Sequence, residues 1–262
     1  MRSAAFAWAE WRTRLAYRAG TPLAVVGSLF TVYAIQAIWK ALYHSPDVVR
    51  VGGVAASGAV SYMVLTRLFA LIMDDTWTLR LMMGDIRRGD VITKLARPVD
   101  LQALLFAHTA GRHLYTFLFQ LVPTLIVSLL FVRIGTPREP LRFLVSLAAA
   151  YLLSFGIQFC VGALTFWWTQ VGGFATFIRV LGNLASGAFV PLWVLPHGVA
   201  TVLRVLPFAG MYSTPLDFYI GQAHGPAAMW GVALQLGWAA ALWGGGRALY
   251  QRGCQRTAYA GG

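Results

Sequence analysis

The chain has 262 residues, of which 58% are hydrophobic and only 11% are charged, against about 45–50% and about 25% in ordinary soluble domains. A soluble monomer of this composition would lack the polar side chains to cover its surface, so the composition favours a membrane protein. The formal net charge of +12 is the excess expected of cytoplasmic loops in such a protein, and it therefore does not indicate a nucleic-acid partner.

The first predicted element is an amphipathic helix over residues 1–20. Trp8, Trp11 and Leu15 fall on one face of this helix. Tryptophan prefers the headgroup level of a bilayer, and arginine prefers an anionic leaflet. We therefore expect the helix to lie in the cytoplasmic interface, in contact with membrane lipids. The alternative is a helix packed on protein.

Six stretches of the chain are apolar and long enough to cross a bilayer, which takes about 20 residues. Together they predict an all-α membrane protein with a single transmembrane domain over residues 1–262. The uncharged run at 143–178 is too long for one crossing, and the polar and glycine residues at 169–173 supply a turn that divides it. The predicted spans are about 21–43, 51–73, 112–132, 143–168, 174–194 and 227–249.

Lysine and arginine are distributed unevenly between the loops that join these spans. If both termini are cytoplasmic, most of the cations fall on the cytoplasmic side, which is the bias that membrane insertion follows. Lys40 and Lys94 are the only lysines among 21 cations, a usage typical of G+C-rich bacterial genomes. We therefore predict a multi-pass protein of the bacterial cytoplasmic (inner) membrane, with both termini in the cytoplasm.

The longest polar segment, residues 74–111, follows the second span. Asp75 can cap a helix that Gly84 ends, and Asp100 can cap a helix that begins at Leu101 and runs into the third span. Short helices at the membrane face would suit contact with a cytoplasmic partner. The alternative is a solvated loop that merely follows the charge rule.

The segment at 195–226, predicted to be exoplasmic, is unusually apolar and rich in proline. Irregular backbone at membrane depth is permitted only where it is buried in protein or lines a cavity. We expect short helices that re-enter the outer leaflet, with a compact lid on the membrane surface as the alternative. The residues that characterise this re-entrant segment and its entry are Pro191, Pro196, Arg204, Pro207, Pro215 and Asp217.

The sequence lacks the motifs of nucleotide and metal chemistry. A phosphate-binding P-loop needs a lysine that follows glycine, whereas Lys40 follows Trp39 and Lys94 follows Thr93. The histidines are scattered, and no metal-binding spacing of histidine or cysteine occurs. We therefore predict no catalytic site, no metal site and no cofactor bound by this chain. Every Asp and Glu lies in a predicted loop or at the end of a span, which argues against proton coupling.

Two groups of motifs carry a resemblance to a known family. The first is Asp85-Ile-Arg-Arg-Gly-Asp90 followed by Leu95-Ala-Arg-Pro-Val-Asp100, and the second includes Ser186-Gly, Leu206-Pro-Phe208 and Tyr219-x-Gly221. With the order of predicted elements, they resemble the membrane subunit of ABC exporters of the second permease type (ABC type 2). The first group is similar to an Ile-x-x-Gly…Leu-x-Arg-Pro-Val signature of a bacterial subfamily.

The resemblance implies a permease that forms the substrate path of an ATP-driven exporter. It also implies a separate ATP-binding cassette ATPase dimer, which would bind ATP and Mg²⁺, and a second permease chain, a related paralogue rather than an identical copy. Complementary charges set the register of docking, so the contact with the ATPase is expected at the charged side chains of the polar segment. These are Asp85, Arg87, Arg88, Asp90, Lys94 and Arg97.

Three other functions stay open. The first is a stand-alone carrier that works without an ATPase, and it is disfavoured by the absence of an acid inside a span. The second is an integral-membrane enzyme that modifies a lipid, for which His197, Asp217 and His224 would be the acid and base groups. The third is a scaffold that transports nothing.

Overall fold

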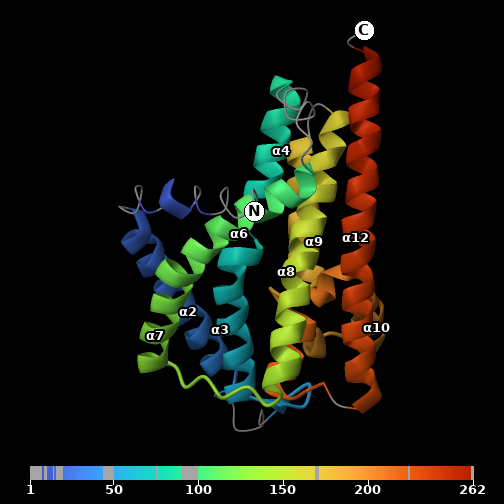
Figure 1. Cartoon of the computed structure of the whole chain (residues 1–262). Coiled ribbons are helices and arrows are strands. Elements are labelled where there is room, and N and C mark those ends of the chain that lie inside the picture. Colours follow the sequence, from blue (N-terminus) through green and yellow to red (C-terminus); the bar gives the residue numbers. More distant parts are fainter. Residues whose placement is uncertain are drawn as a thin grey trace.

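The apolar stretches of the sequence become long helices in the computed structural model (Figure 1). The structure describes residues 8, 11–13, 15, 20–43, 50–74, 76–89, 100–168, 171–223 and 225–260. Its longest helices are α2 (Thr21–Leu42), α3 (Ala56–Met73), α8 (Pro140–Ala163) and α12 (Gly225–Ala260). A further continuous helical run consists of α6 (Leu101–Thr116), the π-helical turn η2 (Phe117–Leu121) and α7 (Val122–Phe131).

Shorter elements connect and cover these helices. A two-stranded antiparallel hairpin, β1 (Arg50–Val51) and β2 (Val54–Ala55), pairs Val51 with Val54. The shorter α-helices are α4 (Trp77–Arg88), α9 (Val171–Ala185), α10 (His197–Val205) and α11 (Ser213–Ile220). The 3-10 turns are η3 (Leu164–Phe166), η4 (Leu192–Val194) and η5 (Pro207–Gly210).

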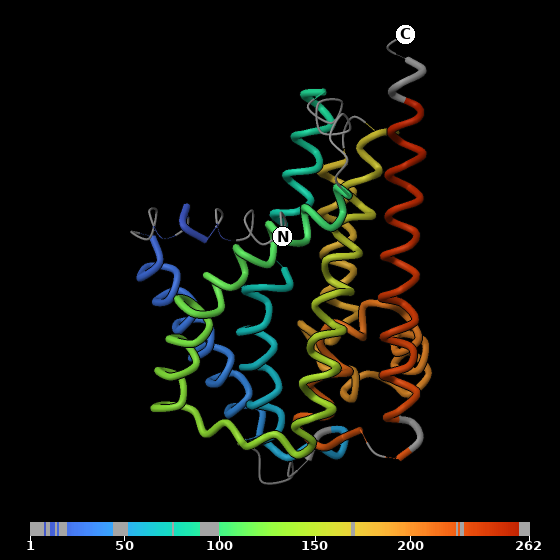
Figure 2. The backbone as a smooth tube through the Cα atoms, in the orientation of Figure 1, coloured from blue at the N-terminus to red at the C-terminus, as the bar shows by residue number. Residues whose placement is uncertain are grey.

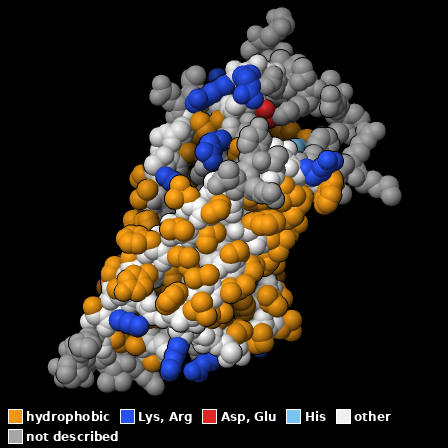
Figure 3. Space-filling view, turned by 90° about the vertical axis from the view of Figure 1, so that its left-hand side faces the viewer, with side chains coloured by type: hydrophobic (Ala, Val, Ile, Leu, Met, Phe, Trp, Pro, Cys, Tyr) orange, Lys and Arg blue, Asp and Glu red, His pale blue; other side chains and the backbone are white. Residues whose placement is uncertain are grey.

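Four helical stretches in the described part of the chain are long and apolar enough to cross a membrane. They are Thr21–Leu42, Ala56–Arg88, Leu101–Phe131 and Pro140–Phe166. Figure 3 shows a belt of hydrophobic side chains across the middle of one face, with Lys and Arg gathered towards both ends. Such a belt matches a bilayer, because apolar side chains face lipid and cations lie at headgroup level. The chain is therefore a predominantly α-helical, multi-pass membrane protein.

The second predicted span, 51–73, begins too early. Residues 50–55 form the β-hairpin, and its turn consists of Gly52 and Gly53 with φ of 56° and 81°. Two consecutive residues with positive φ make the tight turn that joins antiparallel strands, and glycine adopts this conformation without strain. The hydropathy pattern could not distinguish this hairpin from a first helical turn, so helix α3 starts only at Ala56.

The fifth predicted span, 174–194, is shorter than expected. Helix α9 has only 15 residues and ends at Ala185, and Gly187 beyond it has a φ of 82°. Of the residues expected to form the turn before this span, Gly172 and Gly173 lie inside α9, and Thr169 and Gln170 lie outside the described residues. The described part of the break consists of η3, Trp167 and Trp168. Neither α9 nor α12, which contains the sixth predicted span at 227–249, is among the four spanning candidates.

In the polar segment one predicted helix boundary, the start at Leu101, is confirmed, and another, the stop at Gly84, is wrong. Asp100 Oδ1 accepts hydrogen bonds from the backbone N–H groups of Gln102 (3.0 Å) and Ala103 (3.3 Å). This cap confirms the predicted helix start at Leu101, and the helix continues as expected to Phe131. The expected stop at Gly84 is wrong, because α4 runs through it to Arg88 and ends at Gly89, whose φ is 75°. A left-handed glycine directly after the last turn is the stronger helix-ending signal.

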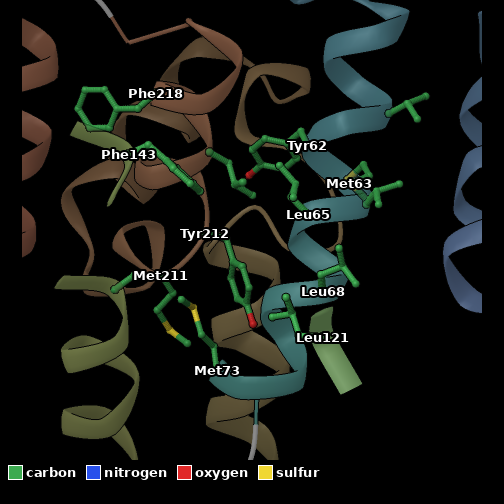
Figure 4. Packing of buried hydrophobic residues seen from close by; sticks show 14 of the residues in the cluster. Tyr62, Met63, Leu65, Leu68, Met73, Leu121, Phe143, Met211, Tyr212 and Phe218 are labelled. Carbon is green, nitrogen blue, oxygen red and sulfur yellow. The ribbon is translucent and has the colours of Figure 1, made fainter. Parts of the chain in front are cut away.

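Helix α8 lies at the centre of the packing. It contacts α12, α4 and α11, and the main core of buried side chains gathers between α3, α8, α11 and α12. Figure 4 shows Tyr62, Leu65 and Leu68 of α3 directed towards Tyr212 and its neighbours. Because these aromatic and aliphatic side chains are fully buried or nearly so, α3 and α8 are held together largely through the segment that contains α11.

One buried polar side chain joins three elements inside this apolar core. Gln235 of α12 is 2% exposed, and its Nε2 donates to the carbonyl oxygens of Ser146 (2.7 Å) and Gly210 (2.8 Å). Its Oε1 accepts from Ser146 Oγ at 2.8 Å. Such bonds between helices satisfy polar groups that hydrocarbon cannot solvate, so Gln235 fixes α12 against α8 and η5.

Small residues let α8 and α12 approach closely. A Cβ atom on Gly246 would lie 2.8 Å from the ring of Phe159 and 3.2 Å from Cys160 Sγ. Phe159 is completely buried and has little room to move. The neighbouring Gly245, by contrast, faces open space. A substitution at Gly246 therefore tests the contact between α8 and α12, whereas a substitution at Gly245 changes only the helix propensity of α12.

We predict that Gly246→Leu destabilises the protein and Gly245→Leu does not. At Gly246 the added side chain overpacks the core, which costs about 1–3 kcal/mol or more. At Gly245 leucine brings a helix propensity better by about 1 kcal/mol and displaces nothing. Thermal unfolding in detergent, followed by circular dichroism, checks both variants. Equal shifts of the two melting temperatures would contradict the close approach of α8 and α12 at Gly246.

Candidate functional site

The tip of α4 carries three of the six residues predicted to contact an ATPase. Arg87 and Arg88 are exposed, whereas Asp85 is only 4% exposed. Arg88 Nη2 lies 3.5 Å from Asp85 Oδ1. A partner approaching this tip therefore meets the two arginines, with Asp85 positioned behind them. The other three predicted residues, Asp90, Lys94 and Arg97, lie outside the described residues.

Three kinds of side-chain contact attach helix α4 to its neighbours. The hydroxyl groups of Thr78 and Thr109 form a hydrogen bond of 2.7 Å that joins α4 to α6. The guanidinium group of Arg112 lies 4.6 Å from the ring centre of Trp77, within the range of a cation–π contact. Met82 is buried in a second apolar cluster formed with α6, α8 and α12. Displacement of α4 must therefore move, or slide against, α6 and α8.

A polar cluster holds the junction between α3 and α4. Asp74, directly after α3, accepts a hydrogen bond from Tyr212 Oη at Oδ1 (2.9 Å) and one from Asn183 Nδ2 at Oδ2 (3.2 Å). Ser154 Oγ of α8 donates to the carbonyl oxygen of Met73 at 2.6 Å. In Figure 4 the hydroxyl of Tyr212 points towards the end of α3. The junction is thus tied to α8, to α9 and to the segment before α11.

A small cavity adjoins this junction. It has a volume of about 60 Å³ and is lined mostly by apolar side chains, together with Asp74, Ser154, Gln158, Arg179 and Asn183. A water molecule occupies about 30 Å³ in the liquid, so the cavity has room for about two waters. It is too small for drug-sized ligands, whose sites are usually about 300–1,000 Å³.

The prolines of the apolar segment begin its short helices. Pro191 and Pro196 directly precede η4 and α10, Pro207 is the first residue of η5, and Pro215 lies in the first turn of α11. At these positions proline loses no intrahelical hydrogen bond, because the first N–H groups of a helix have no partner within it. Figures 1 and 2 show α10, η5 and α11 beside the lower half of α12 and not beyond its end.

Asp217 is the most deeply buried charged group of this segment. Its Oδ2 accepts from Ser213 Oγ at 3.3 Å and lies 4.0 Å from Arg204 Nη2. Helix α11, with 8 residues, is too short to cross a membrane. Asp217 and Arg204 line a cavity of about 380 Å³.

The acid and base set expected of a lipid-modifying enzyme is not assembled among the described residues. His197 is exposed at the start of α10 and does not line the cavity that contains Asp217. His224 lies outside the described residues. The part of the chain that the structure describes also holds no group of three or more metal-binding side chains.

The predicted N-terminal helix is described only in part. Residues 8, 11–13 and 15 are helical, and the ring of Trp11 lies 6.0 Å from that of Tyr115 and 5.9 Å from that of Phe119. Trp8 is 63% exposed, while Leu15 is half-buried. Trp11 therefore packs on α6 and η2, which agrees with the alternative of a helix packed on protein. The exposed Trp8 can face a bilayer, as the expected interfacial helix requires.

Sequence reasoning missed the residues that join the elements through polar contacts. Asn183 and Gln235 are the single amide side chains of the fifth and sixth predicted spans, and this signal could have marked them as contacts between helices. Asp74 and Tyr212 gave no such signal, because an acid at the end of a span and a tyrosine in a loop are common. Only the fold shows that these two residues, far apart in sequence, meet.

Comparisons with known proteins agree with this architecture. Residues 29–261 match the family model described as ABC-2 family transporter protein. Neither a search of curated proteins nor a search of solved structures returned a significant match. The match covers nearly the whole described bundle, and proteins of this family are transport components and not enzymes. The chain therefore belongs to the ABC-2 family of transporter proteins, as a membrane permease component of an ABC transporter.

Proposed function

We propose that the chain is the permease of an ATP-driven exporter and that a separate ATPase dimer docks on the tip of α4. The observation that carries this proposal is α4 itself. Its exposed Arg87 and Arg88 lie at the same end of the bundle as the C-terminal part of α12 (Figure 1). Its other end packs on α6 and α8 and joins the polar cluster around Asp74. A charged tip on a helix fixed in the bundle is suited to receive a mechanical input.

The proposed membrane arrangement has six crossings, with both termini in the cytoplasm of a bacterial cell. Helix α12 has 36 residues, about 54 Å at 1.5 Å per residue, so it can cross the bilayer and extend into the cytoplasm. Helix α9 is about 22 Å long by the same measure. We therefore expect residues 186–223 to complete the fifth crossing as a re-entrant segment. Its position beside α12 in Figures 1 and 2 supports this placement.

The substrate path is expected to form between two permease chains. We expect the second chain to be a related paralogue and not an identical copy. Exposed apolar side chains cover α2 and α7, for example Leu23, Phe30, Leu130 and Phe131. Such faces suit lipid or another helix bundle. In this proposal ATP and Mg²⁺ are held by the ATPase, and this chain contributes no ligand to either.

The proposed mechanism moves the α4 tip when the ATPase pair closes. Because Met82 and Thr78 attach α4 to α8 and α6, a push on the tip tilts these helices as a unit. Asp74 passes part of the motion to α9 and α11 through its bonds to Asn183 and Tyr212. Rigid-body tilting of packed helices is a common way to alternate access to a path. We infer the direction of transport, export, from the resemblance of the sequence to ABC exporters.

We predict that Arg87→Glu combined with Arg88→Glu weakens association with the ATPase roughly tenfold or more, because like charges brought together at an interface cost several kcal/mol. Copurification of the ATPase from the native host and substrate-stimulated ATP hydrolysis measure the effect. Arg252→Glu is the matched control, since Arg252 is an exposed arginine of α12 near the same end of the bundle. If the double variant retains its ATPase as well as the control does, docking on the α4 tip is wrong.

We also predict that Tyr212→Phe uncouples hydrolysis from transport. The variant removes one of two hydrogen bonds to the carboxylate of Asp74, and a bond to a charged group is worth about 1.5–3 kcal/mol. Substrate transported per ATP hydrolysed should fall roughly tenfold, while assembly with the ATPase is retained. Tyr33→Phe, at an exposed tyrosine of α2, is the control. An unchanged transport-to-hydrolysis ratio would remove the Asp74 cluster from the coupling route.

A further inference from the structure

A cavity of about 380 Å³ opens between α10, α11 and the start of α12. Its volume lies within the range of about 300–1,000 Å³ that is usual for small-molecule sites. Polar side chains from α10 and α11 line one part of it, and apolar side chains line the other. The cavity is separate from the α4 tip and from the Asp74 cluster, so neither the docking nor the coupling described above uses it.

The polar part of this cavity contains an incompletely satisfied carboxylate. Asp217 is 9% exposed, and its Oδ1 has no hydrogen-bond partner in the described structure. Oδ2 is occupied by Ser213 and lies near the edge of salt-bridge range from Arg204, at 4.0 Å. A buried carboxylate oxygen without a donor is costly, so the site lacks one donor. Rotation about χ2 of aspartate is broad and roughly two-fold, which lets the unpaired oxygen turn towards the cavity.

Arg204 supplies the opposite charge at the mouth of the cavity. Its side chain is 55% exposed, and its guanidinium group retains donors that the loose contact with Asp217 does not use. Guanidinium groups bind phosphate and carboxylate in planar, two-pronged geometry. The cavity therefore has a hydrogen-bond acceptor, Asp217, inside and an anion-binding donor, Arg204, at its mouth. These two groups complement the positive and the negative charge of a zwitterionic head group.

The rim of the cavity is apolar and faces outwards. Trp230 and Val205 line it and are exposed, as are the neighbouring Val202 and Met229. In a membrane protein such side chains contact acyl chains, and tryptophan favours the level of the headgroups. A ligand with a charged head and an apolar tail would place its head beside Asp217 and its tail along this rim.

We propose that the cavity binds the head group of a zwitterionic amphiphile, with a primary ammonium group donating to Asp217 and a phosphate or carboxylate group bound by Arg204. A primary ammonium carries N–H donors, whereas a trimethylammonium group has none and leaves the oxygen of Asp217 unsatisfied. The site therefore distinguishes phosphoethanolamine from phosphocholine. The ligand class of the proposed permease would then be zwitterionic amphiphiles with a primary ammonium group. The importance of this site for transport rests on the proposed permease function.

Binding is tested without the ATPase, by native mass spectrometry of the full chain purified in detergent. The chain is titrated with phosphatidylethanolamine, phosphatidylcholine or phosphatidylglycerol. We expect phosphatidylethanolamine to bind about tenfold more tightly than the other two, the size of effect that one charge-assisted hydrogen bond gives. Equal binding of the three lipids overturns the proposal. It leaves the permease function standing, since that function is tested through the ATPase.

Variants and a soluble competitor assign the effect to the cavity. Asp217→Asn should abolish the preference, and Arg204→Gln should weaken binding of all three lipids, because each carries a phosphate. Glu139→Gln, at an acid in the loop before α8 that does not line the cavity, should change neither. If Asp217→Asn retains the full preference, the assignment is wrong. Glycerophosphoethanolamine tests the source of the ligand. Displacement of lipid by this compound supports recognition of the head alone, and failure to displace supports a lipid bound through both head and tail.

Discussion

The absence of water in the hydrocarbon of a bilayer is the constraint on which this structure depends. Backbone N–H and C=O groups there must bond within the protein, and helices achieve this within a single segment. Long helices therefore make up most of the described chain. The same constraint explains where irregular backbone occurs. The Gly52–Gly53 turn lies at the end of the bundle, and the prolines of the apolar segment lie where a helix begins.

Amide and carboxyl side chains inside the described bundle join elements that are far apart in the chain. Gln235 joins α12 to α8 and η5, and Asp74 joins the end of α3 to α9 and to the segment before α11. In an apolar interior a polar group without a partner is costly, so these contacts favour one arrangement of the helices over others. Asp217 differs, because one of its oxygens has no partner in the described structure.

The position of α8 connects the two ends of the molecule. On one side of the bundle it packs against α4 and on another against α12, and small residues such as Gly246 allow the close approach to α12. Side chains of α8 also reach the α3–α4 junction, through Ser154 and the carbonyl oxygen of Met73. A rigid central helix with contacts at both ends suits a permease, because interfaces between packed helices shift between discrete arrangements.

The sequence alone determined the class of the protein, the approximate places of four long apolar helices and the cap at Asp100, because composition, hydropathy and local capping act over short distances in the chain. The sequence also carried the resemblance that the match with the ABC-2 family confirmed. Local patterns failed at the hairpin of residues 50–55, where a turn and a first helical turn have similar hydropathy, and at the end of α4, where either Gly84 or Gly89 could end the helix. Tertiary structure alone decided that Asp74 meets Tyr212 and Asn183, that Asp85 is buried behind Arg88, and that Asp217 lines a cavity with Arg204. These pairings join residues by packing across the bundle, and no periodicity in the sequence records which helix faces which.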